Sequence, residues 1–71
     1  MPFTTLQVLP SRLRMGDRFT DADGVWWQIT TQPQARRGGK NFVACVERRF
    51  GQPATARVMV WAAGEYVTIR R

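Results

Sequence analysis

The densest group of residues able to do chemistry lies in the segment Gln32–Asn41, where Arg36, Arg37 and Lys40 surround two adjacent glycines. Glycine lets backbone N–H groups approach an anion closely. Guanidinium and ammonium groups neutralise phosphate charge and release counterions, so such binding depends on salt. The frame of a nucleotide-hydrolysing P-loop is missing, because no Ser or Thr follows the lysine. The segment predicts a phosphate contact, with a solvated, solubilising loop as the alternative.

Aromatic side chains form a second group of candidates. Trp26, Trp61 and Tyr66 can supply rings on which nucleic-acid bases stack, and Arg49 and Arg57 are expected near Trp61. Proteins that bind single strands combine such rings with a positively charged groove. The same rings can instead receive a proline-rich peptide, become buried between two copies of the chain, or cap the ends of the core.

Catalytic and metal-binding chemistry has little support. The chain has one cysteine, Cys45, and no histidine. These numbers exclude an intrachain disulfide, the usual zinc sites and a nucleophile–histidine pair. Asp17, Asp21 and Asp23 cluster near one turn but lack the spacing of a calcium loop, so turn formation explains them. We expect a protein that is not an enzyme and that has neither cofactor nor metal.

The length and charge describe one small basic domain. The chain has 71 residues, with eleven basic and five acidic residues and a net charge of +6. No apolar run approaches the roughly 20 residues of a membrane span, and the first ten residues lack the features of a signal peptide, so we expect a cytoplasmic protein without a membrane partner. We divide it into an extended N-terminal segment, 1–12, and a barrel domain, 13–71.

The chain predicts an all-β fold, because glycine and proline interrupt it at short intervals and no helical period is present. Asp21–Gly24 is a strong turn signal, since aspartate binds its own backbone and glycine accepts a positive φ. The expected strands are Met15–Thr20, Val25–Thr31, Phe42–Arg49, Thr55–Trp61 and Tyr66–Arg70, with a tight turn over Phe50–Ala54 and a helical turn over Ala62–Glu65.

Pairing across the Phe50–Ala54 turn divides these strands into two faces. With Arg49 opposite Thr55, Val46 faces Val58 and Ala44 faces Val60, while Thr31 is placed opposite Phe42. The predicted core is Val25, Trp27, Ile29, Phe42, Ala44, Val46, Val58 and Val60. The predicted outer face is Trp26, Gln28, Thr30, Val43, Cys45, Glu47, Arg49, Arg57, Met59 and Trp61, with Glu47 across from Arg57. Its apolar members are more than a solvated surface needs.

The order of these pieces resembles an SH3-like small barrel, here with five antiparallel strands and a helical turn before the last one. Met15-Gly16-Asp17-Arg18 and the stretch Val58-Met59-Val60-Trp61 are similar to segments of the plasmid-type (type II) dihydrofolate reductases. In that family, a Gln and a Tyr of the fourth strand line a shared pore and bind cofactor and substrate. Met59 and Trp61 stand in their places, and a thioether cannot donate an amide's hydrogen bonds. The resemblance therefore implies the fold and self-association, without the reduction chemistry.

These observations predict a small basic module that binds nucleic acid without reading its sequence. Its expected contacts are Arg36, Arg37, Lys40, Arg49 and Arg57, with stacking on Trp26 or Trp61. The first alternative is a protein-interaction or assembly subunit of the phage or plasmid accessory type, with Val43, Met59, Trp61 and Trp26 as its interface. The second alternative is a pore-forming reductase like the plasmid family.

Overall fold

The regular structure of the described chain is made of strands, apart from one short 3-10 turn. The computed structural model describes residues 4–48 and 55–71. The strands are β1 (Thr5–Val8), β2 (Arg18–Thr20), β3 (Trp26–Ile29), β4 (Gln34–Arg36), β5 (Asn41–Arg48), β6 (Ala56–Ala62) and β7 (Val67–Arg70), with one 3-10 turn at Pro10–Arg12. Within these ranges, no helix is long and apolar enough to cross a membrane. The prediction of an all-β fold is confirmed.

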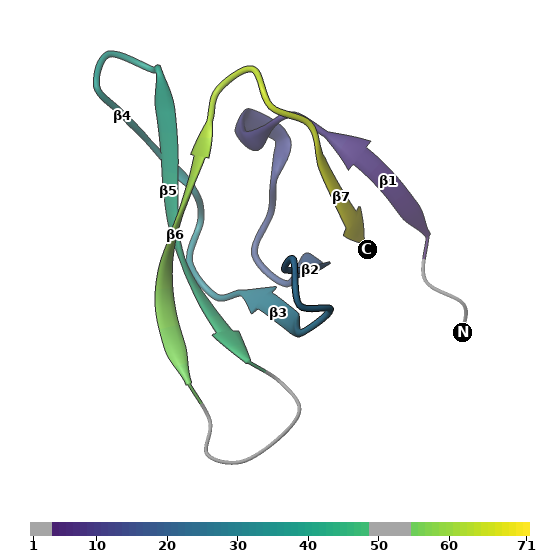
Figure 1. Cartoon of the computed structure of the whole chain (residues 1–71). Helices are drawn as coiled ribbons and strands as arrows, with labels where there is room; N and C mark the ends of the chain where they lie inside the picture. The colour runs from purple at the N-terminus through teal and green to yellow at the C-terminus, as the bar shows by residue number, and fades with distance from the viewer. Residues whose placement is uncertain (1–3, 49–54) are drawn as a thin grey trace.

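The strands form one curled antiparallel sheet, a half-barrel. Its order is β1-β7-β2-β3-β5-β4, and β6 pairs with the other side of β5. Figure 1 shows β5 and β6 as a long ribbon on one side and β1 with β7 on the other. Two backbone hydrogen bonds between Thr4 and Arg71, at 3.1 and 3.0 Å, extend the pairing of β1 with β7 by one residue at the end where β1 begins.

The strand inventory differs from the expected five. The described residues contain seven strands, because Thr5–Val8 adds β1 beside β7 and Gln34–Arg36 adds β4 inside the expected loop. The predicted helical turn at Ala62–Glu65 is instead a tight turn, in which Glu65 N–H donates to the Ala62 carbonyl at 3.0 Å. The predicted turn Phe50–Ala54 lies outside the described residues.

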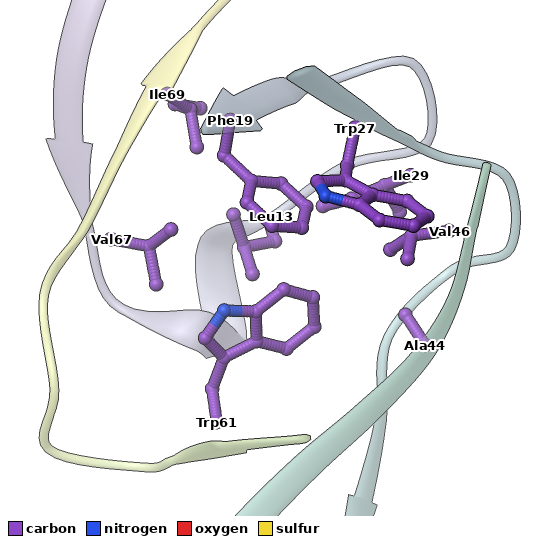
Figure 2. Packing of buried hydrophobic residues seen from close by; sticks show 9 residues of the cluster. All are labelled: Leu13, Phe19, Trp27, Ile29, Ala44, Val46, Trp61, Val67 and Ile69. Carbon is purple, nitrogen blue, oxygen red and sulfur yellow. The ribbon is translucent and has the colours of Figure 1, made fainter. Parts of the chain in front are cut away.

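The core fills the concave side of the sheet. Its buried side chains are Leu13, Phe19, Trp27, Ile29, Ala44, Val46, Trp61, Val67 and Ile69, shown together in Figure 2. The Phe19 and Trp61 rings meet edge to face, with their centroids 5.7 Å apart and an interplanar angle of 76°. Alternation along each strand places all of these residues except Leu13, which lies between the 3-10 turn and β2, on one side of the sheet. The concave side is therefore closed by aromatic packing.

The predicted register between β5 and β6 is wrong by one residue, and this exchanges the two faces of β6. Ala44 pairs with Met59 and Val46 pairs with Arg57, one residue away from the expected partners Val60 and Val58. A slip of one residue reverses the faces of a strand. Val58 and Val60, predicted to be core, are therefore exposed by 64% and 54%, while Trp61 is only 4% exposed.

The pairing of β3 with β5 is also displaced, but without changing the faces. Ile29 pairs with Val46 and Trp27 with Arg48, two residues away from the predicted partners. Because side chains alternate with a period of two, a slip of two residues leaves each one on its original side. Trp27, Ile29 and Val46 are accordingly buried, as the sequence predicted.

Candidate functional site

The basic segment is a structured hairpin tip. Its backbone turns through three consecutive residues with positive φ, namely Arg37 at 53°, Gly38 at 65° and Gly39 at 86°. Gly39 N–H donates to the Arg36 carbonyl at 3.1 Å, and Lys40 N–H donates to the Arg37 carbonyl at 3.3 Å. Glycine adopts this left-handed conformation at little cost, whereas arginine does so with strain. The tip that joins β4 to β5 therefore has a defined shape.

Three cations project from this tip. Arg36, Arg37 and Lys40 are all exposed. Among the described residues, none of the three side chains has a carboxylate within salt-bridge distance. Their charge is therefore available to a ligand, and planar guanidinium forks suit phosphate oxygens. The structure brings these three predicted residues together, and we call Arg36, Arg37 and Lys40 the basic tip.

Trp26 lies on the convex side of the sheet, as predicted, and is half-buried. The guanidinium carbon of Arg70 lies 4.5 Å from the centre of its ring. A guanidinium stacked on an indole is held by its attraction to the ring's electrons. One ring face is thus already occupied, while Arg70 itself remains exposed. The pair presents a cation on an aromatic support.

Arg57 does not lie where the sequence placed it. Its strand partner is Val46, whereas Glu47 pairs with Ala56, so the predicted Glu47–Arg57 pair is absent. The Arg57 guanidinium carbon lies 4.6 Å from the centre of the Trp27 ring, at the rim of the core. The reversed face of β6 explains this position. Arg49 lies outside the described residues.

Trp61 and Met59 also leave the predicted outer face. Trp61 is buried and Met59 packs against the core, so neither joins Trp26 or Val43 in one surface. The expected stacking platform of Trp26 and Trp61 is therefore not assembled. Within the described part of the chain, the exposed large hydrophobic residues are instead Met15, Val58, Val60 and Tyr66, the last 67% exposed.

The acidic residues build turns. Asp21 Oδ2 accepts a hydrogen bond from Trp27 Nε1 at 2.9 Å, and Oδ1 accepts one each from the Val25 and Asp23 backbone N–H groups. The Trp27 bond, together with the backbone bonds, holds the pKa of Asp21 below its usual value of 3.8. Gly24 in the same turn has a φ of 79°, so the predicted turn is confirmed.

Few groups suited to catalysis or metal binding come together. Across residues 4–48 and 55–71, no three His, Cys, Asp or Glu side chains are placed to hold a metal ion. Cys45 is exposed in the middle of β5, with Val58 directly across on β6. A shallow groove of about 260 Å³ beside them is lined by Val43, Gln34 and Arg36 as well.

Comparison of the chain with protein-family models, with curated proteins and with solved structures gives no match.

Proposed function

We propose that this chain is a small nucleic-acid-binding module that contacts phosphates through the basic tip and does not read base sequence. The observation that carries the proposal is the exposure of Arg36, Arg37 and Lys40 on one hairpin of defined shape. Phosphate contacts supply most of the affinity of non-specific complexes. In this proposal the curled sheet is an SH3-like barrel that acts as a rigid support for the tip.

The convex face supplies a second contact in this proposal. Arg70 is exposed and oriented by its stack on Trp26, with a distance of 4.5 Å. A side chain held in place loses less conformational entropy when it binds, so a stacked arginine is a better phosphate ligand than a free one. Trp61 has no part in binding here because it is buried in the core.

The overall charge supports the same partner. The chain carries +6, and Asp17 is neutralised locally by Arg71 at 2.9 Å. A positive field attracts a polyanion over long distances and raises the rate of encounter. Since phosphates occur in every sequence, a contact of this kind predicts similar affinity for unrelated oligonucleotides.

A salt titration of oligonucleotide binding tests the proposal. Fluorescence anisotropy with a labelled duplex and a labelled single strand should give dissociation constants of about 1–100 μM that rise steeply with salt. The variant Arg36→Ala/Arg37→Ala should bind more weakly, and the slope of log K against log salt should fall by about 1–2, close to 0.9 per duplex phosphate contact.

The matched control is Arg12→Ala/Arg14→Ala, which removes the same charge from two other exposed positions. A smaller loss than in the tip variant supports a contact at the tip. Equal losses in the two variants would show that total charge, and not the tip, governs binding. Affinity that does not change between low and high salt would overturn the proposal altogether.

A further inference from the structure

Strand β6 is bonded along one side only, within the described part of the chain. Its partner is β5, and no second strand pairs with it. The hydrogen bonds that flank the pair run from Arg48 N–H to the Thr55 carbonyl at 2.9 Å and from Ala63 N–H to the Lys40 carbonyl at 2.8 Å. In an antiparallel pair, alternate residues bond to the same neighbour. The backbone N–H and carbonyl groups of the odd-numbered residues of β6 therefore point toward β5.

The backbone groups of the even-numbered residues consequently point away from β5. Ala56, Val58 and Val60 each direct an N–H and a carbonyl to the open edge. Ala62 is different, because its N–H donates to Glu65 Oε1 at 2.9 Å and its carbonyl accepts from Glu65 N–H at 3.0 Å. The tight turn thus closes one end of the edge, and Ala56, Val58 and Val60 form what we call the open edge.

The open edge carries few of the features that usually protect an edge strand, because the one charged side chain of β6, Arg57, stacks on Trp27. Pairing with β5 continues residue by residue from Ala56 to Ala62 without a bulge, and this stretch contains neither proline nor lysine. Natural sheets protect long edges with such features because unpaired edges associate with other strands. A cavity of about 420 Å³ beside the edge is lined by Val60, Thr20 and Tyr66, among others.

The side chains of the open edge are apolar. Val58 and Val60 are the exposed valines of β6, at 64% and 54%. They lie across from Cys45 and Val43 on β5, so the apolar strip extends over two strands. Two neighbouring valines with more than half of their surface in water are costly to leave solvated. A strand laid along the edge would satisfy the backbone groups and cover this strip.

We propose that the open edge pairs with the open edge of a second copy of this chain, antiparallel and about a twofold axis at Val58. In this register Val58 meets Val58 of the second copy, and Ala56 meets Val60. Each residue of the open edge then donates and accepts a hydrogen bond, so the two edges satisfy each other completely. A twofold contact of this kind is self-complementary and closes as a dimer.

The charges of β6 fit this pairing. Arg57 is the sole charged residue of the strand and stacks on Trp27. In the proposed register it lies across from Met59 of the second copy. Like charges directly opposite each other destabilise a sheet, and this arrangement avoids them. The pairing leaves the basic tip free, and it does not depend on nucleic-acid binding.

The test compares two substitutions at Val58 in the full chain, by sedimentation velocity over a wide concentration range. Val58→Pro removes an N–H that points to the open edge and leaves the bonds to β5 in place, and proline is accepted on such edges. Val58→Thr keeps the N–H and the β-branched shape. Wild type and Val58→Thr should dimerise, whereas Val58→Pro should raise the dimer dissociation constant at least tenfold.

Circular dichroism must show that both variants are folded. If Val58→Pro does not fold, Val58→Lys gives the answer, because it places two ammonium groups opposite each other at the axis while the position is exposed in the monomer. That variant should be monomeric at low salt and should recover dimerisation as salt rises. A wild type that stays monomeric at all concentrations, or dimers of equal strength in every variant, would overturn the proposal.

The cysteine supplies a second readout. Cys45 lies across from Val58 on the neighbouring strand. The path between the two Cys45 residues of the dimer therefore crosses the β5–β6 pair of one copy, the new β6–β6 pair and the β6–β5 pair of the other copy. Three strand spacings place their Cα atoms about 14 Å apart. Spin labels on Cys45 should show a dipolar interaction in wild type that is lost in Val58→Pro. A dimer without this interaction would use another surface and would contradict the proposed pairing.

Discussion

The guanidinium of Arg71 forms two hydrogen bonds to the buried carboxylate of Asp17. Arg71 Nε donates to Asp17 Oδ1 and Nη2 donates to Oδ2, each at 2.9 Å. Asp17 is 2% exposed and also accepts a hydrogen bond from the Arg14 N–H at 2.9 Å. This contact raises the pKa of Arg71, chiefly through the hydrogen bond to Asp17. It ties the residue after β7 to the segment that leads into β2.

Replacing Asp17 by asparagine should destabilise the fold. The new amide presents N–H groups to the donors of Arg71, and a buried donor or acceptor without a partner costs roughly 1–3 kcal/mol. Urea unfolding followed by tryptophan fluorescence measures the loss. Asp23→Asn, on an exposed side chain, is the matched control and should change the free energy of unfolding by less than about 0.5 kcal/mol. Equal stability of the two variants would contradict a structural role for the hydrogen-bonded pair of Arg71 and Asp17.

A substitution at Trp61 distinguishes a ring that packs in the core from a ring that stacks on a ligand. Because it is buried against Phe19, Trp61→Ala should lower the free energy of unfolding by about 3–5 kcal/mol. That loss is a large part of the total free energy of unfolding of a small domain. The variant should therefore be partly unfolded in thermal melts. Tyr66→Ala, on an exposed ring, should melt near wild type, and a folded Trp61→Ala variant of normal stability would show that the ring is not core.

The hairpin tip offers a test of backbone strain. Gly39 has a φ of 86°, and no atom lies within 4 Å of where a Cβ would be. Gly39→Ala should therefore cost about 1 kcal/mol through the backbone alone. Arg37 has a φ of 53°, so Arg37→Gly should raise the free energy of unfolding by about 0.5–1 kcal/mol. Opposite signs in urea unfolding are expected, and equal effects would argue against the left-handed turn.

Stability should depend on acidic pH through Asp21. Its pKa lies below 3.8 in the fold because of the Trp27 hydrogen bond and the backbone N–H donors. A carboxyl group with a lowered pKa stabilises the fold above its unfolded pKa, and this contribution is lost as the pH falls through the folded pKa. Wild type should therefore be more stable than Asp21→Asn at pH 6, and the difference should shrink below about pH 4. A constant difference from pH 6 to pH 2 would contradict this role.

Much of the local structure could be predicted. The turn at Asp21–Gly24 follows from an aspartate that binds nearby N–H groups and a glycine with positive φ, and it is present. The faces of β3 and β5 follow from alternation of apolar residues, which put Trp27, Ile29 and Val46 inside. The exposed cations of the tip follow from the polar composition of Gln32–Asn41.

The face of β6 could not be predicted in this way. Val58, Met59, Val60 and Trp61 are all apolar, so alternation does not distinguish one side of the strand from the other. The large buried area of a tryptophan favours burial of Trp61 over Val60. That comparison is a signal which the prediction did not use. For the same reason, the exposure of Val58 and Val60 along the open edge was not predicted.

The sequence by itself determined that this chain forms short antiparallel strands and carries a basic, glycine-containing loop, because turn chemistry and alternation act over a few residues. The tertiary structure alone decided which side of β6 is core, where Arg57 and Arg70 rest, and that Arg71 reaches Asp17. These features depend on strand register and on contacts between distant residues. A shift of one residue leaves the local pattern almost unchanged and exchanges the inside of the strand with its surface.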